Sequence, residues 1–397
     1  MVCSIALFSI SLLFSASSLG SELVILMSWD GMRHDYVDKA EYSALKRMEV
    51  EGIRTKLIPT NPSNTFPGHV TLATGAAPAV HGVMDNTMFD LEKGRFSYGS
   101  DASWVNAEPV WIAAERQGKK AATYFWVGSE TDWRGQRHTY RMAPFDGARP
   151  DSEKVKKMIE WMDLPEEARP SLIMAYWRGA DDTAHLKGPD HPDVTQIIAE
   201  QDAQLMILLK AIDSRDLWDT TTVILTSDHG MTPVTNLIAI KTPLVNANVD
   251  AQVFGGSTIK RIFLKNRSQR QSAIETLSKI PNIEIHTADE VPEYLRFPNR
   301  TGDLVITTQA PNALGEYKGF LENLRSYLAP GLGWRTGGHG YDPEHPDMAS
   351  VFLAMGSDVT PGKKIDRVHQ NQIAATVTEL LGLEPPLQAE GQAINLQ

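Results

Sequence analysis

Apolar runs of strand length alternate along this chain with longer amphipathic stretches, and no other feature constrains the fold as strongly. The clearest apolar runs are Leu23–Ser28, Ala121–Trp126, Leu172–Trp177, Thr222–Ser227 and Ser350–Ala354. Stretches of helical length lie at Val110–Gln117, Asp151–Met162, Asp193–Ile212 and Gln372–Leu381. This alternation is typical of βαβ units, and 397 residues of 42% hydrophobic composition can bury a large core. We therefore predict an α/β fold with a central, mostly parallel sheet flanked by helices.

Single residues predict where three of these helices begin or end. Asp151 can cap the start of its helix with its carboxylate. Gly118 and Gly382 follow helical stretches and suit the left-handed conformation that is common after a helix end.

The pattern changes between Lys241 and Gln309, where shorter elements alternate. We expect strands at Ile259–Leu264, Ile283–His286 and Leu304–Thr308, and helices at Gln269–Lys279 and Glu290–Leu295. Residues 241–309 are therefore predicted to form a small α/β insert. Residues 21–240 and 310–397 would then form the core that carries the chemistry.

The first twenty residues predict an exported protein. Val2–Leu19 is uncharged and rich in apolar and small residues, with an apolar centre at Ile5–Phe14, as in a signal peptide. The positively charged start of a signal peptide is missing, so an uncleaved anchor or a misassigned start codon stays open. We predict a signal peptide over residues 1–20 and a periplasmic or secreted protein. Cys3 is the single cysteine, so the mature chain would contain no disulfide.

The formal net charge is −11, and the chain contains no basic run. This balance argues against a nucleic-acid scaffold held by phosphate neutralisation, so no stable nucleic-acid complex is expected. A small anionic substrate can still bind where metal cations dominate the local field. Nothing in the sequence points to an obligate protein partner.

Carboxylates and imidazoles stand where predicted strands end. They are Asp30, the pair Asp181 and His185, the pair Asp228 and His229, and His339 within Gly337–Gly340. Loops beyond the carboxyl ends of parallel strands meet at one edge of a sheet, so these residues can converge. A set of neutral imidazoles and carboxylates suits zinc in particular.

These residues differ in how well structural roles would explain them. Asp181 and His185 are four apart, which places both on one helical face, although a capped surface helix would show the same spacing. Asp228 could instead bond backbone amides in a tight turn. His339 among glycines is hard to explain by packing. Most other histidines, for example His138, His286 and His345, are expected to be surface or loop residues.

Thr65 is a candidate nucleophile. Pro67 predicts the first turn of a helix that continues through Leu72, so Thr65 would lie at its N-terminal edge. Backbone N–H groups and the helix dipole favour a phosphate oxygen and a deprotonated hydroxyl there. A plain N-cap is the alternative.

Seven motifs occur in the order seen in one enzyme family. They are Asp30-Gly31, Thr65-Phe66-Pro67, His81-Gly82-Val83-Met84-Asp85-Asn86, Pro109-Val110-Trp111 with Ala121 to Trp126, Asp181-x-x-x-His185, Ser227-Asp228-His229-Gly230-Met231 and Gly337-Gly338-His339-Gly340-Tyr341. On these motifs the chain resembles the nucleotide pyrophosphatase/phosphodiesterase family (type I phosphodiesterases) of the alkaline phosphatase superfamily. The resemblance covers nearly the whole mature chain and implies an alkaline-phosphatase-like α/β fold.

The resemblance also implies a site with two Zn²⁺ ions per chain. Asp181, His185 and His339 would hold one ion. The second would be held by Asp30, Asp228, His229 and Thr65, with Thr65 also the nucleophile. Asn86 would donate to a phosphoryl oxygen, helped by the backbone amides of Thr65 and Phe66, and the Phe66 ring would stack on a nucleobase.

The activity implied is hydrolysis of phosphodiester or pyrophosphate bonds of nucleotides or nucleotide derivatives through a covalent threonyl-phosphoester. The partner would be the small-molecule substrate. Three positions depart from animal members: Gly68 replaces an asparagine, Ala180 a proline and Ala184 a glycine. These departures bear on pocket shape rather than on metal binding. A second aromatic opposite Phe66 could come from Tyr140 or Phe145.

Four other functions are compatible with parts of the pattern to different degrees. A sulfatase is excluded because the chain lacks the Cys/Ser-x-Pro-x-Arg motif. A phosphomonoesterase of the same superfamily needs cations for a dianionic phosphate, and Arg134, Arg137 and Arg178 could supply them. A phosphonate hydrolase is a lesser alternative. An inactive binding ectodomain would be expected to have lost ligands, whereas all seven positions are filled.

Overall fold

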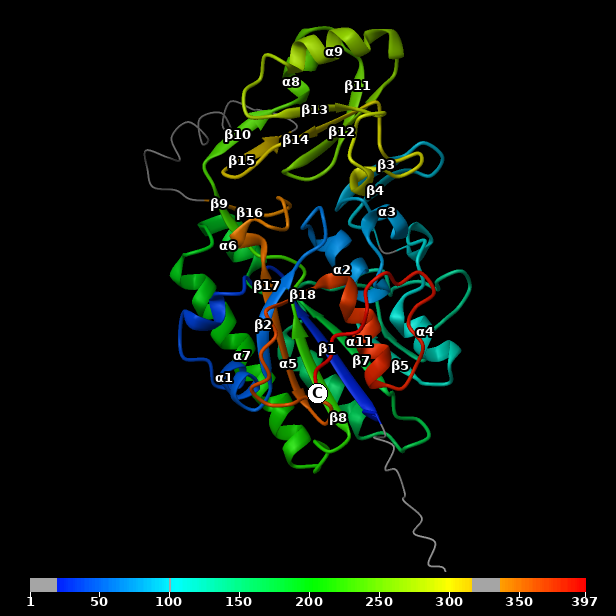
Figure 1. The fold of residues 1–397 in the computed structure, drawn as a ribbon, viewed down its shortest axis with the longest axis vertical. Coiled ribbons are helices and arrows are strands. Elements are labelled where there is room, and N and C mark those ends of the chain that lie inside the picture. The colour runs from blue at the N-terminus through cyan, green and yellow to red at the C-terminus, as the bar shows by residue number, and fades with distance from the viewer. Residues whose placement is uncertain (1–19, 100, 316–335) are drawn as a thin grey trace, which may run out of the picture.

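The computed structural model describes residues 20–99, 101–315 and 336–397, and an eight-stranded sheet forms its centre (Figure 1). The strand order is β18 (Arg367–His369), β2 (Ile53–Ile58), β17 (Ser350–Gly356), β8 (Thr221–Thr226), β1 (Leu23–Trp29), β7 (Leu172–Trp177), β5 (Ala121–Tyr124) and β6 (Tyr140–Met142). Strand β17 is antiparallel to both neighbours, and the remaining neighbouring pairs are parallel. The predicted α/β fold with a mostly parallel sheet is confirmed.

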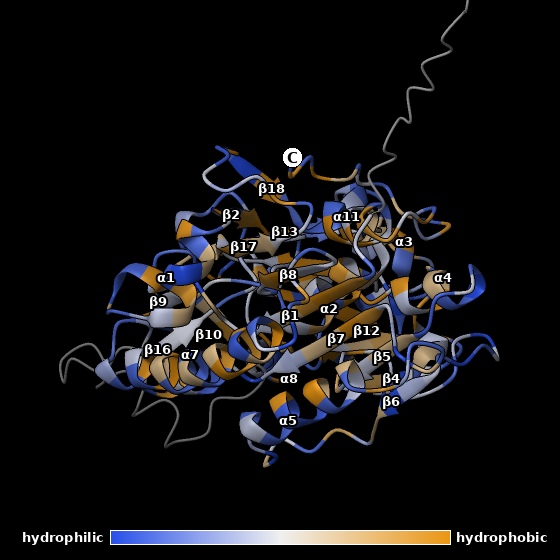
Figure 2. Cartoon of the chain, turned by 90° about the horizontal axis from the view of Figure 1, so that it is seen from below, coloured by the Kyte–Doolittle hydropathy of each residue, from blue (hydrophilic) through white to orange (hydrophobic). Residues whose placement is uncertain are grey.

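Two hydrophobic clusters lie on the two faces of this sheet. In β1, Ile25 and Met27 join one cluster while Val24 and Leu26 join the other, because successive side chains of a strand point to opposite faces. Helices α1 (Ser43–Val50), α5 (Asp151–Met162) and α7 (Pro192–Asp213) cover the first cluster, and α2 (Thr65–Thr74), α4 (Val110–Arg116) and α11 (Ile373–Leu380) the second. In Figure 2 the central strands are mostly orange, for hydrophobic residues, and many of the outer loops are blue, for hydrophilic residues.

Strand β5 is shorter than predicted and ends at Tyr124. The next residue, Phe125, has a φ of +59°, a left-handed conformation that cannot continue a strand. The other strands predicted in the sheet end within two residues of the expected positions.

The predictions for helix ends had mixed outcomes. Gly118 and Gly382 have φ values of +82° and +68°, as predicted for residues after helix ends. The prediction that Asp151 caps α5 was wrong. Pro150 holds the N-cap position, and the Asp151 carboxylate instead lies 2.9 Å from Lys154 Nζ in the first turn.

A second, four-stranded sheet lies beyond one edge of the central sheet (Figure 1). Its order is β11 (Ala251–Phe254), β12 (Ile259–Leu264), β14 (Leu304–Thr307) and β13 (Glu284–Thr287), with antiparallel neighbours. Helices α8 (Lys241–Asn246) and α9 (Arg270–Leu277) pack on it and share a separate hydrophobic cluster. The helix expected at Glu290–Leu295 is reduced to a 3-10 turn, because proline at 292 is extended. The assignment of residues 241–309 to an insert stays a prediction.

Smaller elements connect the two sheets. The pairs are β3 (Thr87–Asp90) with β4 (Gly94–Ser97), β9 (Thr232–Val234) with β16 (Thr336–Gly338), and β10 (Asn236–Ala239) with β15 (Asn312–Gly315). Short helices α3 (Pro78–His81) and α6 (Asp181–Lys187) complete the described chain.

Three further points concern the first residues, membrane spans and one histidine. The predicted signal peptide falls almost entirely in residues 1–19, outside the described residues. Within the described ranges, no helix has both the length and the apolar character that crossing a bilayer requires. His138 lies in a loop, as expected, but it is buried rather than on the surface, and its Nε2 lies 2.7 Å from Thr123 Oγ1.

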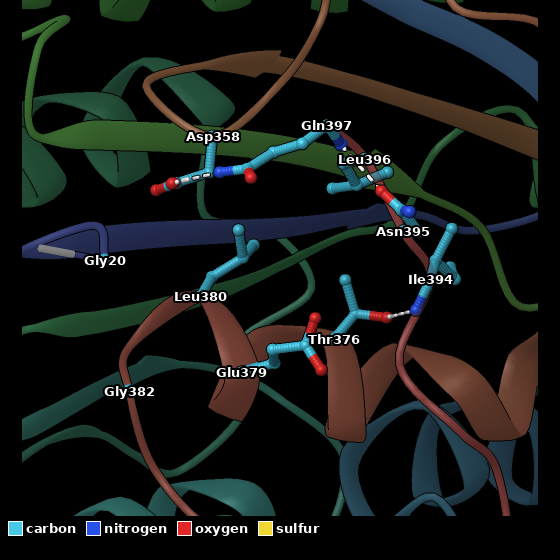
Figure 3. A pocket seen from close by; sticks show the side chains of 10 residues that line it. All are labelled: Gly20, Asp358, Thr376, Glu379, Leu380, Gly382, Ile394, Asn395, Leu396 and Gln397. Carbon is cyan, nitrogen blue, oxygen red and sulfur yellow. Dashed lines mark hydrogen bonds between the residues drawn. The ribbon is translucent and has the colours of Figure 1, made fainter. Parts of the chain in front are cut away.

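A cavity of about 270 Å³ lies where β1 begins (Figure 3). It is lined by the end of α11, by Gly20 and by residues 394–397. Gln397 donates a hydrogen bond to Asp358, which anchors this segment across the cavity. The carboxyl ends of the parallel strands, where the candidate site lies, are at the opposite edge of the sheet.

Candidate active site

The seven predicted site residues converge at the carboxyl ends of β1, β7 and β8. His229 is the centre of one group: its Nε2 lies 3.1 Å from Asp228 Oδ2, 3.5 Å from Asp30 Oδ1 and 3.3 Å from Thr65 Oγ1. The ligand atoms of Asp30, Asp228 and His229 all lie within 4.8 Å of one another. Residues distant in sequence thus form one compact set of donors.

His339 is the centre of a second group beside the first. Its Nε2 lies 3.0 Å from His185 Nε2 and 3.7 Å from Asp181 Oδ1. Asp181 and His185 share one face of α6, as predicted, with 3.4 Å between Oδ1 and Nε2. The rings of His229 and His339 stack at 3.6 Å between centroids, so the two groups adjoin.

Backbone carbonyls fix the orientation of all three imidazoles. Nδ1 of His185 lies 2.9 Å from the oxygen of Gly337, Nδ1 of His229 lies 2.9 Å from that of Gly230, and Nδ1 of His339 lies 3.1 Å from that of Ser63. A carbonyl only accepts, so each Nδ1 donates, and in the neutral form of the ring Nε2 is then the nitrogen with a lone pair. This is the arrangement by which metal-binding histidines are usually oriented.

The carboxylates each keep one oxygen free for a cation. Asp30 Oδ1, Asp181 Oδ1 and Asp228 Oδ2 are buried and receive no hydrogen bond from any residue in the described ranges. The second oxygen of Asp30, Oδ2, accepts a hydrogen bond from Tyr176 Oη at 2.7 Å. A buried carboxylate oxygen without a donor is costly, and a divalent cation would compensate for that cost. Carboxylate oxygens and imidazole nitrogens together suit zinc.

Burial and close neighbours shift the pKa values of the ionisable groups in the site. Burial and the neighbouring Asp228 raise the pKa of Asp30 well above its usual value. Burial and the nearby imidazoles of His229 and His185 lower the pKa of His339 well below its usual value. Burial lowers the pKa of His229, but the neighbouring Asp228 outweighs burial and raises it. Carboxyl groups packed this closely repel one another when ionised, and a bound cation would relieve that repulsion.

Thr65 does not cap α2. Asn64 is the N-cap, with no side-chain capping bond, and Thr65 is the first helical residue. Its hydroxyl faces His229 instead. The structure therefore contradicts the plain N-cap role and leaves the hydroxyl in the cavity with the candidate ligands.

Asn86 lies beside Thr65 in a defined orientation. Its Oδ1 accepts a hydrogen bond from the Phe66 N–H at 2.8 Å, so the Nδ2 group is the donor that faces the Tyr98 hydroxyl and the cavity. The expectation that the Phe66 amide helps to bind phosphoryl oxygen needs correction, because this amide is already paired with Asn86.

A cavity of about 520 Å³ opens over these residues. Asp228 and His229 lie behind its wall, whereas the other candidate site residues line it. The remaining lining includes Phe66, Tyr98, Phe125, Phe145, Tyr176 and Arg178. Phe66 and Tyr98 meet edge to face at 5.5 Å, and Phe125 and Phe145 do so at 5.4 Å. The cavity thus has aromatic walls beside a polar floor.

The predictions for the cavity wall were only partly right. Phe145 lines the cavity, whereas Tyr140 does not: its hydroxyl donates to the Ala168 carbonyl. The three departures from animal relatives also lie outside the described lining. A side chain at Gly68 would place Cβ 3.0 Å from Asp228 Cβ, so this glycine permits close packing behind the site.

The sequence did not reveal two residues, Tyr176 and His69, that hydrogen-bond to residues in or next to the site. Tyr176 holds Asp30 through its hydroxyl. His69 lies one helical turn after Thr65, with Nδ1 2.8 Å from the Thr65 carbonyl and Nε2 2.9 Å from Ser28 Oγ. The four-residue spacing on α2 could have revealed His69, but nothing in the pattern of β7 distinguishes Tyr176 from a core residue.

Comparison with known proteins decides the family. Residues 24–342 match the family described as type I phosphodiesterase / nucleotide pyrophosphatase. The chain belongs to this family. A pyrophosphatase/phosphodiesterase of Schizosaccharomyces pombe, itself uncharacterized, is 30% identical over 91% of this chain and 77% of that protein.

Two animal relatives extend the comparison, and the match spans different shares of their chains. An ectonucleotide pyrophosphatase/phosphodiesterase of Caenorhabditis elegans is 28% identical over 93% of this chain, and the match spans 48% of that protein. Murine ectonucleotide pyrophosphatase/phosphodiesterase 5 has a similar structure, with a TM-score of 0.80, 25% identity and coverage of 91% of this chain and 96% of that one. The predicted family is confirmed, and membership places the chain among hydrolases that act on phosphodiester or pyrophosphate bonds.

Proposed function

We propose that this protein hydrolyses phosphodiester or pyrophosphate bonds of nucleotides or nucleotide derivatives, with Thr65 as the nucleophile. The observation that carries the proposal is the convergence of the Thr65 hydroxyl with three Nε2 lone pairs and three unpaired carboxylate oxygens. A structural polar cluster would be expected to pair these oxygens internally.

Two Zn²⁺ ions fit this donor set. Asp181, His185 and His339 would hold one, and the other would be held by Asp30, Asp228, His229 and Thr65. Bound zinc lowers the proton affinity of a hydroxyl and stabilises charge on the attacking and leaving oxygens.

The chain's own residues then account for the two chemical steps. Thr65 Oγ1 forms a bond to phosphorus as the bond to the leaving oxygen breaks, and water later cleaves the threonyl-phosphoester. Asn86 Nδ2 donates to a non-bridging oxygen, where charge increases in the transition state. Tyr176 orients Asp30 through its hydrogen bond.

The aromatic walls support a nucleotide as the substrate. Phe66 follows the nucleophile directly and lines the cavity, so a base stacked on its ring would hold the phosphorus near Thr65. The name of the family includes nucleotide pyrophosphatases, which agrees with this assignment.

One observation favours a second candidate, a phosphomonoesterase. Arg178 lines the cavity and is half-exposed, although it also pairs with Asp182. Arg134 is turned away, because it donates to the Asn106 carbonyl and covers the Trp133 ring. With one arginine at the wall, we rank the monoesterase below the diesterase.

A substrate panel tests the proposal. Turnover would be measured on bis-p-nitrophenyl phosphate, p-nitrophenyl phosphate and a nucleotide p-nitrophenyl ester, with and without a chelator. We expect the nucleotide ester to be fastest, and all activity to stop with chelator and return with zinc. Preference for the monoester would support the second candidate. Absence of turnover on all three would reject both.

We also propose that the enzyme is exported. The composition of residues 1–20 and the ectonucleotide names of relatives support a periplasmic or secreted enzyme. Mass spectrometry of the mature protein from culture medium or periplasm would test this, and an intact N-terminus in the cytosol would contradict it.

A further inference from the structure

One buried carboxylate connects the second sheet to the candidate site. Asp85 is fully buried and directly precedes Asn86. Its Oδ1 accepts hydrogen bonds from Asn64 Nδ2 at 3.0 Å and from the Asn86 backbone N–H at 2.8 Å. Asn64 directly precedes Thr65, so Asp85 contacts the neighbour of the nucleophile and the backbone of the proposed phosphoryl-oxygen donor.

The other oxygen of Asp85 is held from the second sheet. Oδ2 accepts from the N–H of Gly256, in the loop between β11 and β12, at 2.9 Å. Arg261 on β12 is fully buried, with Nη1 3.9 Å from the same oxygen. Burial raises the pKa of Asp85, and the Arg261 charge and the N–H donors oppose that rise.

The same loop also reaches the second group of candidate ligands. Ser257 Oγ donates to the His339 carbonyl at 3.2 Å, and Thr258 Oγ1 donates to the Gly340 carbonyl. The 255–258 loop therefore contacts Asp85, next to Asn86, and also the backbone at His339. None of its residues lines the cavity over the site.

We propose that Asp85 is a positioning residue: held by the 255–258 loop of the second sheet, it sets the orientation of Asn86 and of the Asn64–Thr65 turn for phosphoryl transfer. This inference rests on the proposed function. Without the carboxylate, the Asn86 backbone and the Asn64 amide would lose a shared, charge-assisted acceptor. Displacements of about 1 Å at a reacting group cost up to about 100-fold in rate.

The chain offers a matched control at the same junction. Asp90 is also buried, and its Oδ2 accepts from Nε of Arg300, a second buried arginine, at 2.7 Å. Its Oδ1 accepts from the N–H groups of Glu92 and Lys93, and it contacts none of the described site residues. Asp90→Asn therefore disturbs the junction without reaching the nucleophile.

The test combines Asp85→Asn and Asp90→Asn with Asn86→Ala in double-mutant cycles on bis-p-nitrophenyl phosphate. We expect Asp85→Asn to lower kcat about 10- to 100-fold with little change in KM. In the Asn86→Ala background it should cost less than about 3-fold, because coupled residues are not additive. Asp90→Asn should lower the melting temperature and leave kcat within about 2-fold of wild type. Equal losses for Asp85→Asn in both backgrounds, or a loss no larger than that of Asp90→Asn, would overturn the positioning role.

A second variant approaches Asp85 from the loop. A Cβ at Gly256 would lie 2.9 Å from Asp85 Oδ1 and 3.0 Å from Asn64 Nδ2, so Gly256→Ala should displace both while every polar group remains. Gly256→Ala replaces Asp85→Asn in the test if Asp85→Asn does not fold. We expect the same fall in kcat and the same coupling to Asn86→Ala. Wild-type kcat in Gly256→Ala would contradict the inference. Loss of the proposed function itself would look different, because the wild type would then be inactive or Thr65→Ala would stay active.

Discussion

Two groups of buried carboxylates in this molecule have opposite surroundings. At the junction of the two sheets, Asp85 and Asp90 have both oxygens hydrogen-bonded and arginines nearby. In the candidate site, Asp30, Asp181 and Asp228 each keep an oxygen that no described residue contacts through a hydrogen bond. Burial alone does not identify a functional acid. The unpaired oxygen does, because it marks a place that is completed by a ligand.

The largest expected effect is a loss of turnover without a loss of stability, on substitution of Thr65. Thr65→Ala should lower kcat by about 10⁴-fold or more, because the group that forms the covalent bond is removed. The melting temperature should stay close to wild type, since a small hydroxyl is lost from a cavity wall. Steady-state kinetics and calorimetry measure the two quantities. Near-normal turnover in this variant would refute the nucleophile.

Metal removal should show that the unpaired oxygens need cations. Elemental analysis of the native enzyme should give close to two zinc ions per chain. Chelation should lower stability by about 3 kcal/mol or more, because anything that binds the native state tightly stabilises it by mass action. Thermal unfolding with and without chelator measures this. Magnesium as the sole metal would overturn the choice of zinc.

At the junction of the two sheets, substitution of Asp90 should lower stability rather than turnover. Asp90→Asn breaks a buried ion pair and should cost about 3 kcal/mol of unfolding free energy at neutral pH. Burial opposes ionisation of Asp90, but Arg300 outweighs it and lowers the pKa, so its contribution is present above pH 4 and is lost as pH falls further. Denaturant titrations of both proteins at pH 7 and pH 3 should show the difference shrinking. A constant difference would contradict this account.

The smallest effect should come from Tyr176. Tyr176→Phe removes the hydrogen bond to Asp30 Oδ2 but keeps the ring, and should cost about 1 to 2 kcal/mol in kcat/KM. Asp30 would then be free to turn its second oxygen, so we also expect weaker zinc binding in competition with a chelator. Unchanged metal affinity and turnover would show that ring packing alone positions Asp30.

The sequence predicted five strands of the central sheet and the seven residues that converge, but it missed β2, β6 and β18. Each of the residues around β1, β7 and β8 follows a recognisable apolar run, and the carboxyl ends of parallel strands lie at one edge. The local signal and the tertiary arrangement therefore agree at Asp30, Asp181 and Asp228.

The sequence could not predict contacts that depend on how separate segments pack. Tyr98 and Phe125 line the cavity from left-handed backbone positions, and neither has a residue type that favours this conformation. Asp151 has a residue type that favours the N-cap position, yet Pro150 occupies that position and Asp151 is the first residue of α5. Asp85 looks like an ordinary motif residue until the second sheet is folded against it.

The main-chain anchoring of the three imidazoles has an evolutionary consequence. Because carbonyl groups of Ser63, Gly230 and Gly337 hold the rings, substitution of neighbouring side chains need not turn an imidazole out of its position. Substitutions in the aromatic walls can then change the cavity while the three imidazoles keep their orientation. New leaving groups would become accessible by mutation of residues such as Tyr98 and Phe145, at little risk to catalysis.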